Sequence, residues 1–159
     1  MRNILVTGGT NFVSRYAAEY FLKLGDIVYV LNRGSREQSK GVIHIKGDRN
    51  ALTDELKGYR FDVVLDVTAY TGQDVKNLLD ALEDFDDYIL ISSSAVYPET
   101  AQMPFAQTEA VGRNRIWGDY GTNKIEAEKE LLRRFPSAYP SRHHSCAAHR
   151  TWGQLLLLK

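Results

Sequence analysis

The chain has 159 residues, 43% of them hydrophobic and 25% charged, so it is long enough for one globular domain with its own core. Twenty basic and 20 acidic residues cancel, which argues against a nucleic-acid partner and against binding to an anionic membrane surface. No apolar run approaches membrane-spanning length, no signal peptide is evident, and the single cysteine, Cys146, excludes an internal disulfide. We therefore expect a cytoplasmic protein without membrane contact.

Five apolar runs predict strands, and they alternate with stretches of helical periodicity. The predicted strands span residues 3–7, 26–31, 42–45, 61–67 and 88–91, and the predicted helices span residues 12–24, 52–56, 75–82 and 117–135. Gly25 is well placed to end the first helix. This alternation predicts an α/β fold, a doubly wound parallel sheet with helices on both faces. Ligands of such sheets bind at the carboxyl ends of the strands.

The first strand runs directly into the first helix through Gly8, Gly9, Thr10 and Asn11. Such a turn aims free N–H groups and the positive end of the helix dipole at one point, which suits a phosphate. A nucleotide-type ligand is therefore the first hypothesis, with a plain strand-to-helix turn as the alternative. Asparagine tolerates a left-handed backbone better than most residues, so the turn is feasible with Asn11 in it.

Polar residues follow the next predicted strands at the same edge of the sheet. The second strand ends in Asn32 and Arg33, where a guanidinium can pair with a phosphate or simply be solvated in a loop. The third strand is followed by Asp48, a candidate ligand contact or an ordinary turn former. We expect this edge to carry the ligand site.

Tyr120 and Lys124 are four residues apart on the last predicted helix and share one face. An ammonium beside a phenol favours the phenolate, so this pair suits proton transfer to or from a substrate oxygen. A surface helix pair is the alternative. A serine run, Ser92 to Ser94, follows the fifth strand, where it either caps the strand or supplies a hydroxyl to the same site.

Together these motifs resemble the short-chain dehydrogenase/reductase superfamily, in its extended or atypical branch of NAD(P)-dependent epimerase/dehydratase-like proteins, over about residues 3 to 135. That family has three glycines at threefold spacing in its first turn. Here Gly8 occupies the first position, whereas Asn11 and Ser14 occupy the other two. The run from Ile91 to Tyr97 is similar to the family's motif after strand five, and the Tyr120–Lys124 pair is similar to its catalytic pair.

The resemblance implies a Rossmann fold and an epimerase, dehydratase or oxidoreductase that acts on a carbonyl or hydroxyl of a small molecule, such as a sugar nucleotide. It gives Tyr120 the acid/base role, Lys124 the tuning of that phenol, and Ser93 the orientation of the substrate. The cofactor is NAD(P), with NADP favoured because the second strand ends in Arg33 rather than in a carboxylate. The implied cofactor contacts are Gly8, Thr10, Asn11, Phe12, Val13, Asn32, Arg33, Asp48, Arg49, Thr68 and Ala69.

The end of the chain departs from the family. We expect a Rossmann domain over 1–137 and an atypical tail over 138–159, truncated before the small substrate domain of extended members, because the tail has neither strand alternation nor a helical stripe before Leu155. His143, Cys146 and His149 are spaced like zinc ligands without an evident fourth, so we predict no metal. A homodimer is expected by analogy. A non-catalytic, redox-sensing dinucleotide-binding module and an inactive truncated fragment are the alternatives to an enzyme.

Overall fold

The computed structural model describes residues 1–101 and 109–136, together with the backbone of residues 145–149. Within these ranges six strands form one sheet in the order β3-β2-β1-β4-β5-β6. The strands are β1 (Asn3–Thr7), β2 (Ile27–Asn32), β3 (Ile43–Lys46), β4 (Arg60–Asp66), β5 (Asp84–Ile91) and β6 (Ser145–His149). The helices are α1 (Phe12–Lys23), α2 (Gly72–Ala81) and α3 (Asp119–Arg134), and a short 3₁₀ helix, η1 (Ser94–Val96), follows β5.

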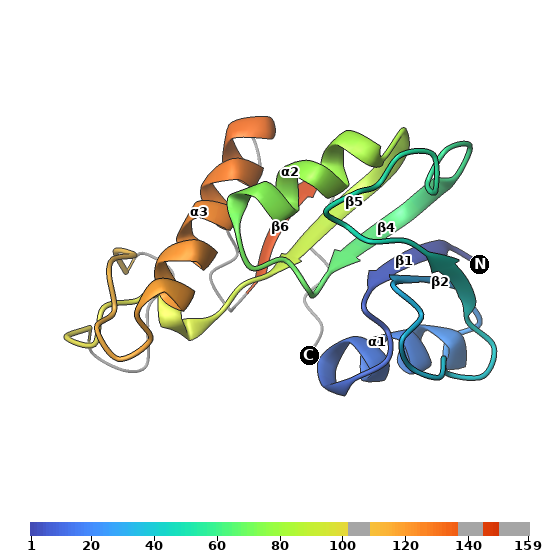
Figure 1. Cartoon of the computed structure of the whole chain (residues 1–159), viewed down its shortest axis with the longest axis horizontal. Helices are drawn as coiled ribbons and strands as arrows, with labels where there is room; N and C mark the ends of the chain where they lie inside the picture. Colours follow the sequence, from blue (N-terminus) through green and yellow to red (C-terminus); the bar gives the residue numbers. More distant parts are fainter. Residues whose placement is uncertain (102–108, 137–144, 150–159) are drawn as a thin grey trace.

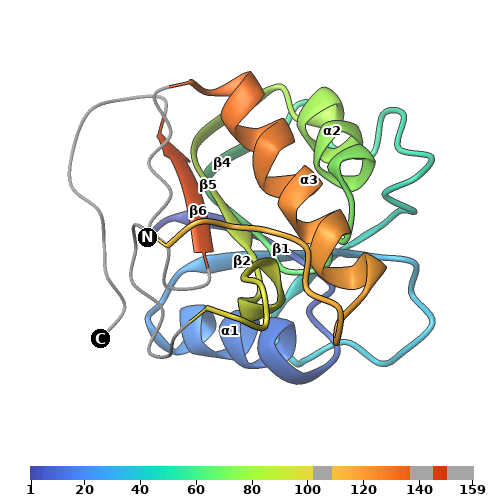
Figure 2. The same cartoon turned by 90° about the vertical axis from the view of Figure 1, so that its left-hand side faces the viewer.

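Helices cover both faces of the sheet, with α1 on one face and α2 and α3 on the other (Figures 1 and 2). β1 lies at the centre, between β2 and β4, and pairs with both in parallel. Successive residues of β1 therefore point into two different cores: Ile4 packs on the α1 side, and Leu5 packs on the α2–α3 side. This double burial is why the central strands are continuously apolar.

Each core is built from alternate strand residues and one side of the covering helices. Ala18 of α1 packs against Ile4, Val6, Val28 and Val30 of the sheet. On the other face Val75, Leu78, Ala127 and Leu131 of α2 and α3 cover a group that includes Leu5, Val64, Tyr88 and Leu90. These two layers hold the carboxyl ends of β1, β2, β4 and β5 in fixed positions.

The predicted doubly wound α/β fold is confirmed, with β1 to β5 all parallel. Two expectations are wrong. The predicted helix over residues 52–56 is a series of turns, in which the amide of Lys57 bonds to the carbonyl of Asp54 at 3.1 Å. β5 begins at Asp84, four residues earlier than predicted, because Arg60 pairs with the carboxylates of Asp84 and Asp86 at the acidic start of the strand.

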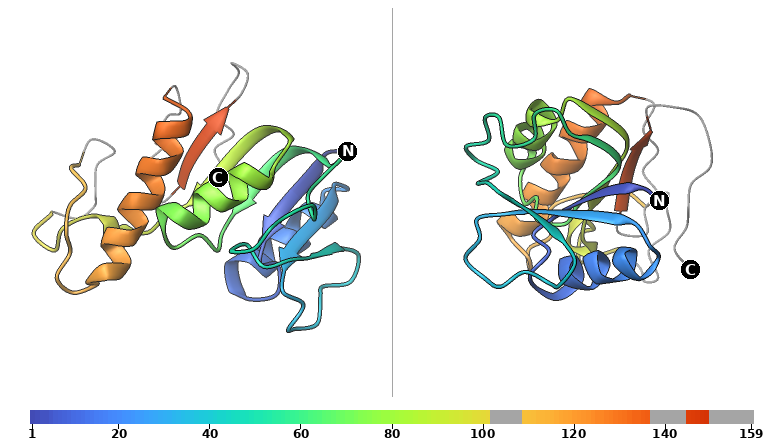
Figure 3. Two further views of the ribbon diagram at one scale, coloured as in Figure 1. Left: turned by 45° about the horizontal axis from the view of Figure 1, so that its top comes forward. Right: turned by 90° about the vertical axis from the view of Figure 1, so that its right-hand side faces the viewer.

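The tail also differs from its prediction, because residues 145–149 form β6, which pairs antiparallel with β5 and lies beside α3 (Figure 3).

The domain boundary after residue 137 stays a prediction, and His143 of the suggested zinc triplet lies outside the described residues. Among the described residues no three His, Cys, Asp or Glu side chains gather as metal ligands. No helix in those ranges has the length and apolar character needed to cross a bilayer.

Candidate active site

A cleft of about 350 Å³ opens at the carboxyl ends of β1, β2 and β4. Most of the predicted cofactor contacts line it: Gly8, Thr10, Asn32, Arg33, Asp48, Arg49 and Thr68. Asn11, Phe12 and Val13 are instead exposed at the start of α1, outside the cleft lining. Ala69 is fully buried beside the cleft and takes part in the site through its backbone carbonyl.

The turn between β1 and α1 forms one end of this cleft, and it needs glycine at two positions. Gly8 and Gly9 have φ of 92° and 74°. A Cβ on Gly9 would lie 2.4 Å from a methyl of Val30, and one on Gly8 would lie 2.9 Å from the Ser14 hydroxyl. The expected left-handed Asn11 is not needed, since its φ is −146°, and the positive φ of 42° falls on Phe12 instead.

The N-terminus of α1 has neither a side-chain cap from Asn11 nor an acidic residue in its first turn. Ser14 is buried and donates its hydroxyl to the Asn11 carbonyl at 2.8 Å, which leaves the amides of the first turn without a side-chain acceptor. The first-turn amides and the helix dipole are thus available for an anion.

Two arginines face the cleft after β2. Arg33 was predicted, but Arg36 was not, although it stands only three residues later in the same basic loop. Asn32 also has a structural role. Its amide donates to the Gly8 carbonyl at 2.6 Å and to Gln38 at 2.9 Å, so it ties the loop to the glycine turn.

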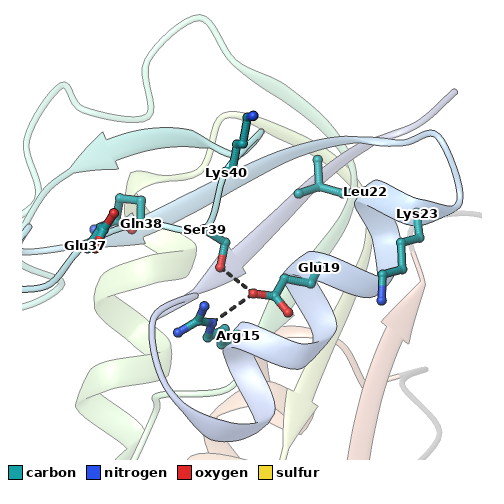
Figure 4. Close-up of a pocket in the computed structure, with 8 residues that line it drawn as sticks. All are labelled: Arg15, Glu19, Leu22, Lys23, Glu37, Gln38, Ser39 and Lys40. Carbon is teal, nitrogen blue, oxygen red and sulfur yellow. Dashed lines mark hydrogen bonds and ion pairs between the residues drawn. The ribbon is translucent and has the colours of Figure 1, made fainter.

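A second and larger hollow, of about 470 Å³, lies between α1 and the connection from β2 to β3 (Figure 4). At its centre Glu19 accepts hydrogen bonds from Arg15 at 2.8 Å and from Ser39 at 2.9 Å. The hollow is away from the strand ends, so we place the candidate site in the smaller cleft. The Glu19–Ser39 contact anchors the loop that carries the two arginines to α1.

A buried polar network lies beneath the cleft. Asp66, which is fully buried at the end of β4, accepts two hydrogen bonds from Arg49 at 3.0 and 2.8 Å. It also accepts from the hydroxyl of Thr7 at 2.8 Å and from that of Tyr88 at 2.5 Å. Burial raises the pKa of Tyr88 well above its usual value, and Asp66 raises it further, so this phenol is held as a donor. Arg49 is thus committed to a structural ion pair although it lines the cleft.

The loop after β4, residues 67–71, connects this network to α3. The Thr7 hydroxyl accepts the amides of Val67 and Thr68 at 2.9 and 3.1 Å, and Arg49 donates to the Thr68 hydroxyl at 3.0 Å. Further along the loop, the Ala69 carbonyl accepts the ammonium of Lys124 at 2.7 Å. Backbone groups at both ends of the loop are therefore fixed, and its conformation is set by side chains from β1, α3 and the loop after β3.

Lys124 is buried where β4 and β5 end. Its ammonium donates to the carbonyls of Ala69 and Ile91 at 2.7 and 2.8 Å, so the described residues use two of its three donors. Burial lowers the pKa of this ammonium. The predicted amine is therefore at the same edge of the sheet as the cleft.

Gly121 brings α3 against the segment that carries Ser93. A Cβ on Gly121 would lie 2.3 Å from the Ala95 carbonyl oxygen, so only glycine permits this approach. The preceding residue, Tyr120, is half-buried, and its ring lies 5.8 Å from that of Tyr70. The Ser93 hydroxyl accepts the Ala95 amide at 3.2 Å, while Ser92 bonds to Glu128. The structure thus gathers Ser93, Tyr120 and Lys124 at one end of the sheet.

Sequence reasoning overlooked Asp66, Asp74, Tyr88 and Asn114, which support these groups. The sequence offers one signal: Asp66 stands between apolar residues in the stretch Val63 to Val67, and a buried carboxylate requires partners. Asp74 completes a capping box with Thr71 and accepts the Tyr70 amide at 2.9 Å. Burial opposes its ionisation, but the Tyr70 and Thr71 amides, the Thr71 hydroxyl and the charge of Arg49 together lower the pKa of Asp74.

Comparisons with known proteins identify the family of the chain. The sequence profile of the NAD dependent epimerase/dehydratase family matches residues 4–139. The chain is 28% identical to chloroplast stem-loop binding protein of 41 kDa b from Arabidopsis thaliana, over 80% of this chain and 39% of that protein. It is 26% identical to UDP-glucose 4-epimerase of Erwinia amylovora, over 87% of this chain and 50% of that enzyme.

Among solved structures, a short-chain dehydrogenase/reductase superfamily protein from Agrobacterium tumefaciens with bound NAD superposes with a TM-score of 0.65 at 22% identity. The superposition covers 83% of this chain and 44% of that one. At this identity the likeness shows the fold. The chain spans half or less of the length of each of these relatives.

Proposed function

Because the chain belongs to the NAD dependent epimerase/dehydratase family, we propose that the cleft binds NAD(P) and that Tyr120, assisted by Lys124 and Ser93, transfers a proton to or from a carbonyl or hydroxyl substrate. The observation that carries this proposal is the position of Lys124. Its buried ammonium bonds to the last residue of β5 and to the loop after β4, beside the cleft, on the helix turn next to Tyr120.

The residues present fit a dinucleotide. The close-packed Gly8–Gly9 turn brings the backbone to one end of the cleft, and the uncapped start of α1 offers amides to a pyrophosphate. Bound NAD(P) would supply the hydride acceptor or donor. Tyr120 exchanges the proton with the substrate oxygen, and Ser93 donates a hydrogen bond to that same oxygen. Lys124, one helix turn after Tyr120, holds its ammonium where β4 and β5 end.

We further propose a preference for NADP. Arg33 and Arg36 line the cleft where β2 ends, and guanidinium groups pair well with a 2′-phosphate. This preference is tested by calorimetric titration of NADPH and NADH into the parent protein and into the Arg33→Ala and Arg36→Ala variants. Each variant should lose about tenfold in NADPH affinity, typical of a charge-assisted hydrogen bond, and little in NADH affinity. Lys40→Ala, in the same loop but outside the cleft, is the control.

The chemistry is tested by turnover on a panel of carbonyl and sugar-nucleotide substrates. Nucleotide oxidation or reduction should be lost in Tyr120→Phe and retained in Tyr16→Phe, a change of the same kind on the exposed face of α1. Micromolar nucleotide binding without turnover on any substrate would favour a non-catalytic dinucleotide-binding module. Absence of binding by either nucleotide would refute the proposal and favour an inactive fragment.

A further inference from the structure

Two exposed aromatic rings stand beside Tyr120. The ring centres of Tyr70 and Trp117 lie 5.8 and 6.4 Å from that of Tyr120. Tyr70 is 58% exposed and Trp117 is 57% exposed. We call these three residues the aromatic ledge. Large aromatic side chains that gather on a surface, rather than being scattered singly, mark a binding site.

Trp117 is held in place by a buried asparagine. The Asn114 side chain donates to the Tyr97 carbonyl at 2.7 Å and accepts the amides of Ile116 and Trp117 at 2.9 and 3.1 Å. Asn114 is only 5% exposed, so this turn is anchored on the segment that follows η1. The indole is therefore presented in the free protein on fixed backbone, which lowers the entropic cost of binding.

Tyr70 is also fixed and extends the ledge to the cleft. Its amide donates to Asp74 at 2.9 Å, and its ring lies over the Lys124 ammonium, 5.6 Å from nitrogen to ring centre. Tyr70 is itself one of the residues that line the cleft. A substrate on the ledge would thus lie between Tyr120 and the proposed cofactor.

The chemistry of the ledge favours an apolar ring over a sugar. Tyr120 is inclined by 64° to Tyr70 and by 59° to Trp117, so neither neighbouring ring stacks flat on it. The polar groups of the ledge are the Tyr70 and Tyr120 hydroxyls and the Trp117 indole N–H, at the edges of large apolar rings. The Asn114 amide and two donors of Lys124 are already used within the described protein. Next to Trp117, Ile116 adds an aliphatic side chain that is 76% exposed.

We propose that the aromatic ledge binds an aryl ring of the substrate and that Tyr70 and Trp117 determine specificity for it. The inference rests on the proposed function, because it takes the Tyr120 hydroxyl as the group that meets the substrate oxygen. An aryl carbonyl or aryl alcohol then places its ring against the ledge and its oxygen at Tyr120.

The probe is benzyl alcohol, which combines an aryl ring with a hydroxyl. Trp117 and Trp152 are the two tryptophans of the chain, so a Trp152→Phe background leaves Trp117 as the reporter in fluorescence titrations. Benzyl alcohol should change the Trp117 emission saturably. In that background Tyr70→Leu, which keeps apolar bulk without a ring, should raise the dissociation constant about five- to tenfold, the value of one aromatic pair. Tyr16→Leu, an exposed tyrosine on α1, should leave it unchanged.

Equal weakening in Tyr70→Leu and Tyr16→Leu would overturn the ledge proposal. Saturable binding of methyl glucoside in place of benzyl alcohol would do the same and indicate a sugar ring. NADPH titration of the same proteins separates the two proposals. NADPH binding without benzyl alcohol binding refutes the ledge alone, whereas benzyl alcohol binding without binding of either nucleotide refutes the cofactor site alone.

Discussion

Gly121→Ala is the substitution that most directly tests how α3 is positioned. In a solvent-exposed helix interior, replacing glycine by alanine stabilises a protein by about 1 kcal/mol. Gly121 is buried, and the new methyl would lie 2.3 Å from the Ala95 carbonyl oxygen. An ordinary contact of this kind is about 3.3 Å, so α3 or η1 must move by about 1 Å.

The crowding should outweigh the gain in helix propensity. Overpacking a close contact costs about 1–3 kcal/mol, so the net change should be a loss of about 1 kcal/mol instead of a gain of similar size. The same displacement moves Tyr120 relative to the segment that carries Ser93. A shift of about 1 Å in a reacting group can lower turnover about 100-fold.

Urea unfolding measures the first effect, and nucleotide-linked turnover measures the second. Thr122→Ala, an exposed change on the same helix turn, is the matched control and should be neutral or slightly stabilising. NADPH affinity should change little in Gly121→Ala, because its methyl would meet the segment after β5 rather than the cleft. If Gly121→Ala unfolded at higher urea than the parent with unchanged turnover, the close approach of α3 to η1 would be wrong.

Three further predictions concern the supporting structure. Asp66→Asn should lower the free energy of unfolding in urea by about 3–5 kcal/mol, because Arg49 loses its buried partner. An Arg49→Met/Asp66→Leu double variant should lose less stability than the sum of its two single changes, and additive losses would contradict a coupled pair. Because the pKa of Asp74 is lowered on folding, its ionised form adds stability above the unfolded pKa of about 3.9, which is lost as pH falls through the folded value. Asp74→Asn should therefore cost about 1–2 kcal/mol at neutral pH and less in acid, and a loss independent of pH would exclude this role. Gly25→Ala should lower the free energy of unfolding by about 1 kcal/mol, because of its φ of 84° alone. Gly9→Ala should lower it at least twice as much, because its methyl also meets Val30. Equal losses would show that the β1–α1 turn tolerates a side chain at Gly9.

Sequence patterns predicted the frame of the fold because its central strands are buried on both faces. A short apolar run such as residues 3–7 predicts a buried strand in an α/β protein, and the helices between the strands show clear apolar spacing. The errors occur where long-range contacts outweigh local pattern. The acidic start of β5 reads as a loop until Arg60 supplies its partner, and β6 forms against β5 without an alternating pattern of its own.

For the site, the sequence predicted that the polar side chains lie at the carboxyl ends of the strands, but it did not predict their hydrogen bonds. The role of Lys124 toward Tyr120 stays a prediction, and the structure adds two hydrogen bonds from its ammonium to backbone carbonyls. Arg49 and Asn32 line the cleft, so their contact with the cofactor stays a prediction. The structure adds that Arg49 pairs with Asp66 and that Asn32 ties a loop to Gly8. Local spacing shows which residues can reach an edge of the sheet. It does not show which neighbour will be the hydrogen-bond partner of each side chain.

The network around Asp66 restricts how this sequence can change over time. Its carboxylate has three side-chain donors, on Thr7, Arg49 and Tyr88, which come from three separate stretches of the chain. Loss of any one leaves a charge or polar group inside the protein without its partner, so single substitutions here carry a large penalty. Descendants of this chain should exchange the charged pair together or keep it whole, and the mutational route between those two outcomes passes through an unstable intermediate.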